Sequence, residues 1–260
     1  MIRVAVANQK GGVGKTTSAI NLATALAANG WRVVLIDLDP QGNASTGLGV
    51  TQSMRTRSSY DLLTGGADLN GAAIATRIPR LDLVPATVDL SGAEIELVDL
   101  DRRTHRLVDA LDATAGSRWD VCLIDCPPSL GLLTVNALVA VQHVLVPLQC
   151  EFFALEGLSQ LLQTVERVRA RSNPGLSILG VALTMFDRRN KLSAQVAADV
   201  RACLGNIVFE TVIPRNVRLS EAPSHGLPAL IYDHRCSGSE AYIGLARELI
   251  GRLPQPAAAA

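Results

Sequence analysis

The 260-residue sequence predicts an α/β fold with a doubly wound, mostly parallel sheet. Three observations favour this fold class. Short apolar runs rich in β-branched residues alternate with helical patterns, a glycine-rich loop follows the first run, and two other runs end in aspartate. Strands of a parallel sheet are covered on both faces, so they read as continuous apolar runs. Such sheets bind ligands at the carboxyl ends of their strands, where the loop and the aspartates are expected to meet.

Six apolar runs are expected to form the strands. In chain order they span 2–8, 31–37, 81–86, 119–125, 143–148 and 176–184. Helices are expected between them, at about 15–29, 91–113, 131–141, 155–172, 192–204 and 238–252. We expect residues 1–253 to form a single domain, and the proline- and alanine-rich segment 254–260 to be a disordered tail.

The composition describes a globular protein and excludes several other classes. Lys and Arg together number 24, Asp and Glu also number 24, and 48% of the residues are hydrophobic, which argues against a disordered or polybasic chain. The five cysteines are odd in number and contain no CxxC pair, so neither a disulfide framework nor a zinc site is predicted. We find no signal-peptide pattern and expect a cytoplasmic protein.

The glycine-rich loop is expected to bind phosphate. Residues 9–17 read QKGGVGKTT and lie between the first strand and the first helix. Glycines allow successive backbone N–H groups to surround an anion at a helix N-terminus, where the helix dipole also favours negative charge. Lys15 is predicted to reach the β- and γ-phosphates of a nucleotide, and Thr16 to ligate Mg²⁺. The general pattern GxxxxGK[ST] has glycine where this chain has Gln9, and a second lysine, Lys10, follows it.

Two aspartates at strand ends support a nucleotide site. The second strand leads into DLDPQGN, which contains Asp39, and the fourth ends in LIDCPP, which contains Asp125. Both strand ends are expected at the same sheet edge as the phosphate loop. Asp125 is predicted to hold Mg²⁺ through its water shell, and Asp39 to position or polarise the attacking water.

Five segments resemble the deviant Walker-A ATPases, a group within the P-loop NTPase fold, and specifically the ParA/Soj partitioning family. They are KGGVGKTT, DLDPQGNAS, LIDCPPSLG, TMFDRRNKLSAQV (184–196) and VIPRNVRLSEAPSHGLPALIYD (212–233). The resemblance therefore extends over nearly the whole chain. It implies ATP and Mg²⁺ as cofactors, and an activity that hydrolyses ATP to ADP and phosphate.

The resemblance also implies roles for particular residues. Lys10 would be the signature lysine, which reaches the phosphates of the partner subunit in a nucleotide-sandwich dimer. The catalytic residues would then be Lys10, Lys15 and Asp39, and the metal residues Thr16, Asp39 and Asp125. The expected nucleotide-binding residues are Lys10, Gly11, Gly12, Val13, Gly14, Lys15, Thr16 and Thr17 at the phosphates, with Pro214, Arg215 and Asn216 beside the adenine together with the end of the 176–184 strand.

The family likeness implies three kinds of partner: a second copy of the chain, double-stranded DNA bound without sequence preference, and a ParB-type protein that stimulates hydrolysis. Residues 187–218 carry six Lys and Arg against three Asp and Glu, and such a surface can neutralise DNA phosphates. The predicted DNA contacts are Arg188, Arg189, Lys191, Arg215 and Arg218. A cytoplasmic, nucleoid-associated protein without stable membrane association is expected.

Other functions fit the sequence less well. A MinD-type membrane-cycling ATPase is the main alternative, but its basic amphipathic C-terminal helix is interrupted here by Pro254 and an alanine tail. A nitrogenase-iron-protein-like reductase needs cluster cysteines in a different context from Cys122 and Cys126. A GTPase is disfavoured because Ser193 replaces the guanine-reading aspartate of NKxD. A binding module without turnover would not need Asp39.

Two charged clusters are interpreted as ordinary solvated surface. Arg167, Arg169 and Arg171 lie on one expected helix, where spacing places two of them on the same face. The expected helix 91–113 carries acidic and basic residues that form a mixed face. Such a face could dock a partner, but solvation explains it more simply.

Overall fold

The computed structural model describes residues 1–114 and 118–254. Its strands are β1 (Ile2–Val6), β2 (Val33–Asp37), β3 (Ile74–Ala75), β4 (Leu81–Val84), β5 (Val121–Asp125), β6 (His143–Gln149) and β7 (Ser177–Thr184). The longer helices are α1 (Lys15–Ala28), α7 (Leu132–Ala140), α8 (Ala154–Arg171), α9 (Lys191–Leu204) and α12 (Ser237–Arg252). All six predicted strands and the five corresponding long helices are present.

Shorter elements complete the described chain. The α-helices among them are α2 (Asn43–Gly47), α3 (Ser59–Thr64), α4 (Leu69–Ala72), α5 (Leu90–Glu96), α6 (Arg106–Asp112), α10 (Val217–Glu221) and α11 (Ala229–Tyr232). The 3-10 turns are η1 (Gln52–Met54), η2 (Leu97–Asp99), η3 (Gly205–Ile207) and η4 (Ala222–His225). Most of these were not predicted, because segments of three to seven residues are too short to show a hydrophobic period.

The strands form one sheet in the order β3-β4-β2-β5-β1-β6-β7. Every neighbouring pair is parallel except β3 and β4, which are antiparallel. Strand β1 therefore lies inside the sheet, and the chain winds outward from it in both directions. The predicted doubly wound, mostly parallel sheet is confirmed, with β3 added as a short antiparallel edge.

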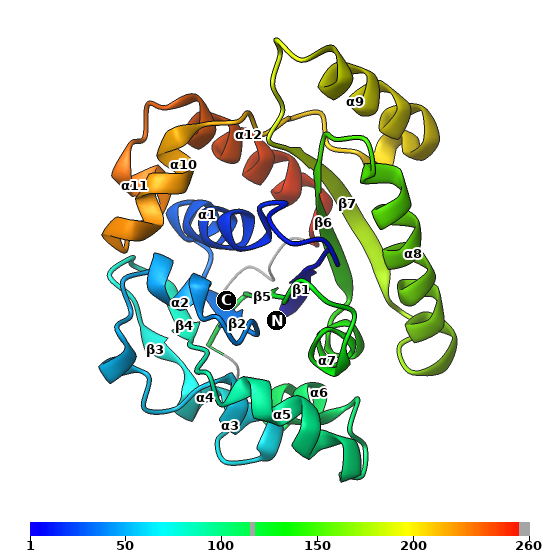
Figure 1. Cartoon of the computed structure of the whole chain (residues 1–260). Coiled ribbons are helices and arrows are strands. Elements are labelled where there is room, and N and C mark those ends of the chain that lie inside the picture. The colour runs from blue at the N-terminus through cyan, green and yellow to red at the C-terminus, as the bar shows by residue number, and fades with distance from the viewer. Residues whose placement is uncertain (115–117, 255–260) are drawn as a thin grey trace.

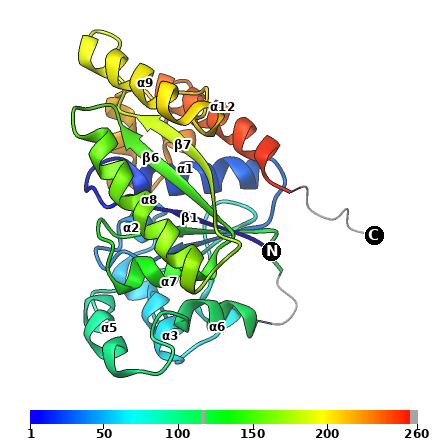
Figure 2. The ribbon, with the colours of Figure 1, turned by 90° about the vertical axis from the view of Figure 1, so that its right-hand side faces the viewer.

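Helices cover both faces of the sheet (Figures 1 and 2). Helices α1 and α12 pack on one face, where they bury Leu22, Leu26 and Leu245 against Val33 and Leu35 of β2. On the other face, α5, α6, α7 and α8 contribute to a second core that includes the alternate β2 residues. Side chains alternate between the two faces along each strand. Because helices cover both faces of the sheet, the central strands carry apolar residues on both sides.

The prediction of one helix at 91–113 is wrong, because the chain forms three separate elements there. Helix α5 and turn η2 end at Asp99, Arg102 adopts a positive φ of 56°, and α6 begins only at Arg106. The side chain of Asn136 on α7 stabilises this break, since it accepts a hydrogen bond from Leu107 N at 3.2 Å and donates one to Arg103 O at 2.8 Å. A partner distant in the sequence thus replaces the helical hydrogen bonds. The predicted tail lies outside the described residues except for Pro254.

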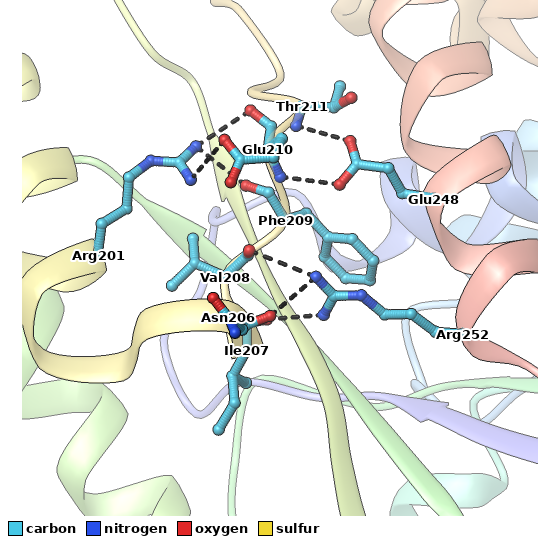
Figure 3. A network of polar contacts seen from close by, with 9 residues as sticks. All are labelled: Arg201, Asn206, Ile207, Val208, Phe209, Glu210, Thr211, Glu248 and Arg252. Carbon is cyan, nitrogen blue, oxygen red and sulfur yellow. Dashed lines mark hydrogen bonds and ion pairs between the residues drawn. The ribbon is translucent and has the colours of Figure 1, made fainter.

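Two helices hold the segment 206–211 beside β7 (Figure 3). From α9, Arg201 donates hydrogen bonds at 3.0 Å to the carbonyl oxygens of Phe209 and Glu210. From α12, the Glu248 carboxylate accepts hydrogen bonds at 2.8 Å from the backbone N–H groups of Glu210 and Thr211. These contacts fix the chain immediately before it reaches residues 212–216.

Arg252 at the end of α12 makes further contacts with the same segment. Together, Arg201, Glu248 and Arg252 are here called the clasp. Its guanidinium lies 3.9 Å from the centre of the Phe209 ring. The same guanidinium donates hydrogen bonds to the carbonyl oxygens of Leu179, Asn206, Ile207 and Val208. One side chain therefore joins β7, the 206–211 segment and the last helix.

We expect Arg252→Ala to lower the free energy of unfolding by about 1.5–3 kcal/mol, the usual magnitude when a charged group loses its hydrogen bonds. Arg247→Ala is the matched control, because Arg247 lies exposed on the same helix. Urea denaturation followed by circular dichroism measures both. Equal stabilities of the two variants would contradict the role assigned to Arg252.

Candidate nucleotide and magnesium site

The carboxyl ends of three central strands bring the acidic residues together. Asp37 at the end of β2 is the direct register partner of Asp125 at the end of β5. Asp125 is also paired with Val6, the last residue of β1. The phosphate loop begins three residues beyond Val6, so loop and carboxylates meet at one sheet edge, as predicted.

The phosphate loop has a backbone that glycine makes possible. Gly12 and Gly14 adopt positive φ values of 76° and 86°, a region in which side chains other than glycine are strained. Gly14 is the N-cap of α1 and has no side chain to satisfy the first N–H groups of this helix. An anion is the natural partner for such a helix terminus.

Three side-chain hydrogen bonds hold the loop in place. Asn8 donates to Pro147 O at 2.8 Å and accepts from Lys10 N at 3.0 Å. Thr184, the last residue of β7, donates its hydroxyl proton to Val13 O at 2.9 Å. The loop is therefore anchored to β6 and β7 without any ligand.

Lys15 is buried at the base of the loop. Lys15 as a whole is 6% exposed, and its Nζ donates a hydrogen bond to Lys10 O at 2.8 Å. Burial lowers the pKa of Lys15, while the nearby Asp125 and Asp39 act in the opposite direction. A buried ammonium is unfavourable without negative partners, and nucleotide phosphates would supply them.

Asp125 is the buried group that most clearly requires a ligand. It is fully buried, and neither carboxylate oxygen has a hydrogen-bond partner among the described residues. Burial first and then the charge of Asp37 raise the pKa of Asp125, whereas Thr16 and Lys15 counteract this rise. Carboxylate and hydroxyl oxygens are the ligands that Mg²⁺ prefers, so Asp125 and Thr16 fit a magnesium ion.

Asp37 has a structural role that the sequence analysis did not assign. It is fully buried, and its Oδ2 accepts hydrogen bonds from Ser45 N at 2.8 Å and Ser45 Oγ at 2.7 Å. Burial raises the pKa of Asp37 to about 6, although the Ser45 hydrogen bonds oppose this. The carboxylate fixes the loop 39–45, on which Asp39 is carried.

Asp39 lies in this loop at the sheet edge and is 7% exposed. Its backbone N–H donates to Asp37 Oδ1 at 3.3 Å, and its own Oδ1 accepts from Gln41 N at 3.0 Å. The predicted proximity of Asp39 to the phosphate lysine is supported by its electrostatic influence on Lys15. Its roles in hydrolysis and metal binding stay predictions.

Lys10 has a partner within its own chain. The ammonium forms an ion pair with Glu151, which follows β6, and the side chain of Lys10 is 40% exposed. Phe152 and Phe153 follow Glu151 and are 73% and 60% exposed. The action of Lys10 on a second subunit stays a prediction. Glu151 and the two phenylalanines were missed, since no motif marks them.

A small pocket beside the phosphate loop gathers the residues expected around the adenine. It has a volume of about 160 Å³, and its lining includes Gly14, Thr17, Pro214, Arg215 and Asn216. Phe186 brings these segments together, because its N–H donates to Ile213 O at 3.1 Å and its carbonyl accepts from Arg215 N at 3.0 Å. Thr184 and Met185 at the end of β7 also line it.

Tyr242 of α12 is a further lining residue that the sequence analysis missed. Its hydroxyl forms a 3.0 Å hydrogen bond with Ser18 Oγ on α1. A tyrosine in a C-terminal helix carries no signal of a nucleotide site. Only the packing of α12 on α1 brings it there.

Three of the five predicted DNA contacts line one groove of about 930 Å³ between the loop that follows β7 and the first turns of α12. They are Arg188, Arg189 and Arg215, whereas Lys191 and Arg218 lie outside its lining. Arg189 is ion-paired with Asp187 at 3.0 Å and lowers the pKa of that carboxyl to about 2. Arg215 and Asn216 line both this groove and the adjacent pocket.

Arg218 on α10 is half exposed and bound by acidic neighbours. Its guanidinium lies 2.9 Å from Glu221 and 3.5 Å from Asp233. These carboxylates neutralise part of its charge. Arg188 has no ion-pair partner among the residues that the structure describes, whereas Arg189 and Arg218 are each paired with a carboxylate. The positive charge of Arg188 is therefore more available to a DNA phosphate.

The phosphate loop, the buried lysine and the unpaired aspartate at one edge of a parallel sheet define a P-loop nucleotide-binding protein. A family model described as an AAA domain matches residues 1–178. The chain is 62% identical to the chromosome partitioning protein ParA of Caulobacter vibrioides, over 96% of this chain and 94% of the relative. It is 52% identical to the sporulation initiation inhibitor protein Soj of Bacillus subtilis, over 95% and 97%. The chain belongs to the ParA/Soj family of partitioning ATPases.

A solved structure supports the same fold. The cobyrinic acid a,c-diamide synthase of Mycobacterium smegmatis, with bound ADP and magnesium, superposes with a TM-score of 0.83 at 38% identity, covering 96% of this chain and 94% of that one. The predicted P-loop NTPase fold and family are confirmed. Within residues 1–114 and 118–254, no helix combines the length and apolarity needed to span a membrane.

Asp125→Asn should stabilise the nucleotide-free protein while impairing its activity. The raised pKa of Asp125 means that the folded chain retains a proton that the unfolded chain loses above its ordinary pKa of 3.8. Stability of the unsubstituted protein therefore declines as the pH rises from about 4. The variant should unfold at higher urea concentration at pH 8, with a smaller decline between pH 5 and 8.

Magnesium-dependent ATP hydrolysis by Asp125→Asn should fall by about tenfold or more, because metal ligation needs the carboxylate. Asp112→Asn is the control, since that exposed carboxylate pairs with Arg3, far from the loop. A variant less stable than the unsubstituted protein at pH 8 would contradict the assignment of Asp125 as an unpaired buried charge.

Proposed function

We propose that this chain is a Mg²⁺-dependent DNA-segregation ATPase that acts on a chromosome or plasmid. ATP binding drives formation of a sandwich homodimer that binds duplex DNA without sequence preference. A ParB-type partner then stimulates hydrolysis to ADP and phosphate, which releases the DNA. The observation that carries the proposal is the arrangement of Arg215, which lines both the pocket beside the phosphate loop and the basic groove.

Each residue of the phosphate site has a separate role in the proposed ATP hydrolysis. The loop N–H groups and Lys15 bind the phosphates, whose charge relieves the unfavourable burial of the lysine. Asp125 and Thr16 hold Mg²⁺, which neutralises phosphate charge when bound. Asp39 orients the attacking water and accepts its hydrogen bond. Lys10 of the second subunit adds a positive charge that is available only in the dimer.

The ion pair between Lys10 and Glu151 fits this dimer-dependent role. In the single chain, the carboxylate neutralises Lys10 and keeps it at the surface. The exposed Phe152 and Phe153 lie next in the sequence, and exposed aromatic side chains are favoured at protein interfaces. We therefore place the dimer contact on this side of the phosphate loop.

Nucleotide binding is coupled to DNA binding through the segment 212–216. A base in the small pocket would contact Pro214, Arg215 and Asn216, and the same three residues also line the groove. Arg188 and Arg189 provide further charge, and DNA phosphates need no base-specific contact to bind such residues. The cytoplasmic, nucleoid-associated location follows from this activity.

A MinD-like membrane cycle fits the C-terminal helix poorly. Helix α12 buries Tyr242, Leu245 and Leu249 against the sheet, and Leu253 after it is also buried. A helix that lies on a membrane must present its apolar face to the lipid. Here α1 and the core that it shares with the sheet cover that face.

Asp39→Ala should retain ATP and remain bound to DNA, because the phosphate contacts persist while the water is no longer positioned. Its ATP hydrolysis should fall by at least about 10²-fold, the usual contribution of a general base. Lys15→Ala should lose ATP binding altogether. Fluorescent-nucleotide binding and phosphate release measure these properties, and an Asp39→Ala protein that hydrolyses ATP at the normal rate would exclude the proposed role.

Arg188→Glu should weaken binding to duplex DNA in the presence of ATP by at least about fivefold, and should reduce its salt dependence by about one unit of slope or more. Arg218→Glu should act in the same direction. ATP binding should not change. Arg167→Glu is the control, because this exposed arginine lies on α8, away from the groove.

Binding to fluorescent duplex DNA is measured by fluorescence anisotropy at fixed salt, with ATP, with ADP and without nucleotide. Binding with ATP alone supports the proposed cycle. Equal DNA retention by Arg188→Glu and Arg167→Glu would remove the groove from the DNA-binding surface. Association with anionic vesicles in ATP, without DNA binding, would replace the proposal with a membrane cycle.

A further inference from the structure

The position of the Asp39 carboxylate depends on the backbone around it. Among the described residues, one hydrogen bond reaches this carboxylate, and it comes from Gln41 N, only two residues further on. The carbonyl oxygen of Asp39 accepts a second local hydrogen bond, from Gly42 N at 2.8 Å. The residues 39–50, which include α2, are here called the Asp39 segment. Any group that fixes the backbone of this segment therefore also fixes Asp39.

Arg55 contacts the Asp39 segment from outside it. Its guanidinium donates hydrogen bonds to Thr46 Oγ1 at 2.8 Å and to Val50 O at 3.1 Å. It also donates to Ala86 O at 2.9 Å, in the chain that leaves β4. Strand β4 pairs with β2, the strand that leads into Asp39. One side chain thus ties the Asp39 segment to the neighbouring strand of the sheet.

Gly42 allows the guanidinium to lie directly against the turn that contains Asp39. Gly42 is the N-cap of α2 and adopts a positive φ of 63°. A Cβ atom at this position would collide with Nη1 of Arg55 and would lie 3.3 Å from Ala86 O. Because Gly42 is hydrogen-bonded to the carbonyl oxygen of Asp39, the contact with Arg55 is one residue contact away from the proposed catalytic carboxylate.

Asp37 holds the same segment from the side of the sheet. Ser45, which donates two hydrogen bonds to Asp37, is the neighbour of Thr46, which accepts one from Arg55. Burial lowers the pKa of Arg55, and the charge of Asp37 opposes this fall. The first turn of α2 is therefore held between a carboxylate and a guanidinium, and both contacts are present without a nucleotide.

The chemistry of arginine suits this position. A planar guanidinium has five donors in a fixed geometry, so it can bond to several acceptors at once, whereas a lysine ammonium acts as a single point. Arg55 does not line the small pocket beside the phosphate loop. Its contacts therefore support the Asp39 segment and not the nucleotide.

A group that orients an attacking water acts only from a narrow range of positions. A displacement of about 1 Å can lower the rate of an enzymatic reaction by about 10²-fold. We propose that Arg55 is a positioning residue for ATP hydrolysis, which fixes the Asp39 segment and thereby holds the Asp39 carboxylate where it orients the water. This inference rests on the proposed function for the role of Asp39.

Arg55→Met tests the inference, because it removes the guanidinium but keeps the unbranched apolar part of the side chain. ATP affinity should not change, whereas kcat should fall by about ten- to hundredfold. Arg57→Met is the matched control, since Arg57 is exposed, lies two residues further on and donates to Gly66 O at 2.8 Å, outside the Asp39 segment. Fluorescent-nucleotide binding measures the affinity, and phosphate release at saturating ATP, with duplex DNA and the ParB-type protein, measures kcat.

The same substitution in the Asp39→Ala protein separates positioning from a general structural effect. If Arg55 acts through Asp39, Arg55→Met should lower the residual rate of the Asp39→Ala protein by less than about twofold. A loss of folded protein would instead lower the rate by the same factor in both backgrounds. Single-turnover phosphate release with the protein in excess over ATP resolves these slow rates.

Arg55→Lys is the second variant and decides the inference if Arg55→Met does not fold. One ammonium cannot bond to both the Asp39 segment and Ala86 O in the geometry of the guanidinium, so kcat should fall by about threefold or more. No such fall is expected in the Asp39→Ala background. Urea denaturation followed by circular dichroism shows that each variant is folded under the assay conditions.

The inference is overturned if the kcat of the Arg55 variant equals that of Arg57→Met, or if its ATP affinity falls by the same factor as its rate. It is also overturned if the defects of the Arg55 and Asp39 substitutions multiply. The proposed function fails by a different result, namely an Asp39→Ala protein that hydrolyses ATP at the unsubstituted rate.

Discussion

Burial of ionisable side chains at one edge of the sheet is the constraint on which the rest of this structure depends. Asp37 and Asp125 are neighbours in register and fully buried, and Lys15 lies beside them with 6% exposure. Charges placed in a poorly polarisable interior are unfavourable unless other charges compensate them. The protein leaves Asp125 without hydrogen-bond partners among the described residues, and this arrangement is suited to a site completed by a magnesium nucleotide.

The elements around this edge prevent it from relaxing. Thr184 and Asn8 tie the phosphate loop to the outer strands, and Asp37 holds the loop that carries Asp39. Backbone donors that are fixed before the ligand arrives need no reorganisation when it binds. The clasp formed by Arg201, Glu248 and Arg252 gives the same stiffness to the segment before Pro214. These contacts hold the phosphate loop and the segment before Pro214 in place.

Charge is distributed unevenly in a chain whose formal net charge is zero. Arg188, Arg189 and Arg215 line a groove next to α12, while residues 88–101, with five carboxylates and neither lysine nor arginine, belong to the segment around α5 (Figures 1 and 2). Opposite charges on separate surfaces favour different classes of macromolecule.

The sequence by itself determined the features that depend on neighbouring residues. Apolar runs identified six strands, and the order of strand, glycine loop and helix identified the phosphate site around Lys15. The tertiary structure alone decided which distant residues meet. It placed Asp37 beside Asp125, brought Tyr242 and Arg215 to the small pocket beside the phosphate loop, and used Asn136 to interrupt the expected helix 91–113. Periodicity reports which face of an element is apolar, but not what covers it.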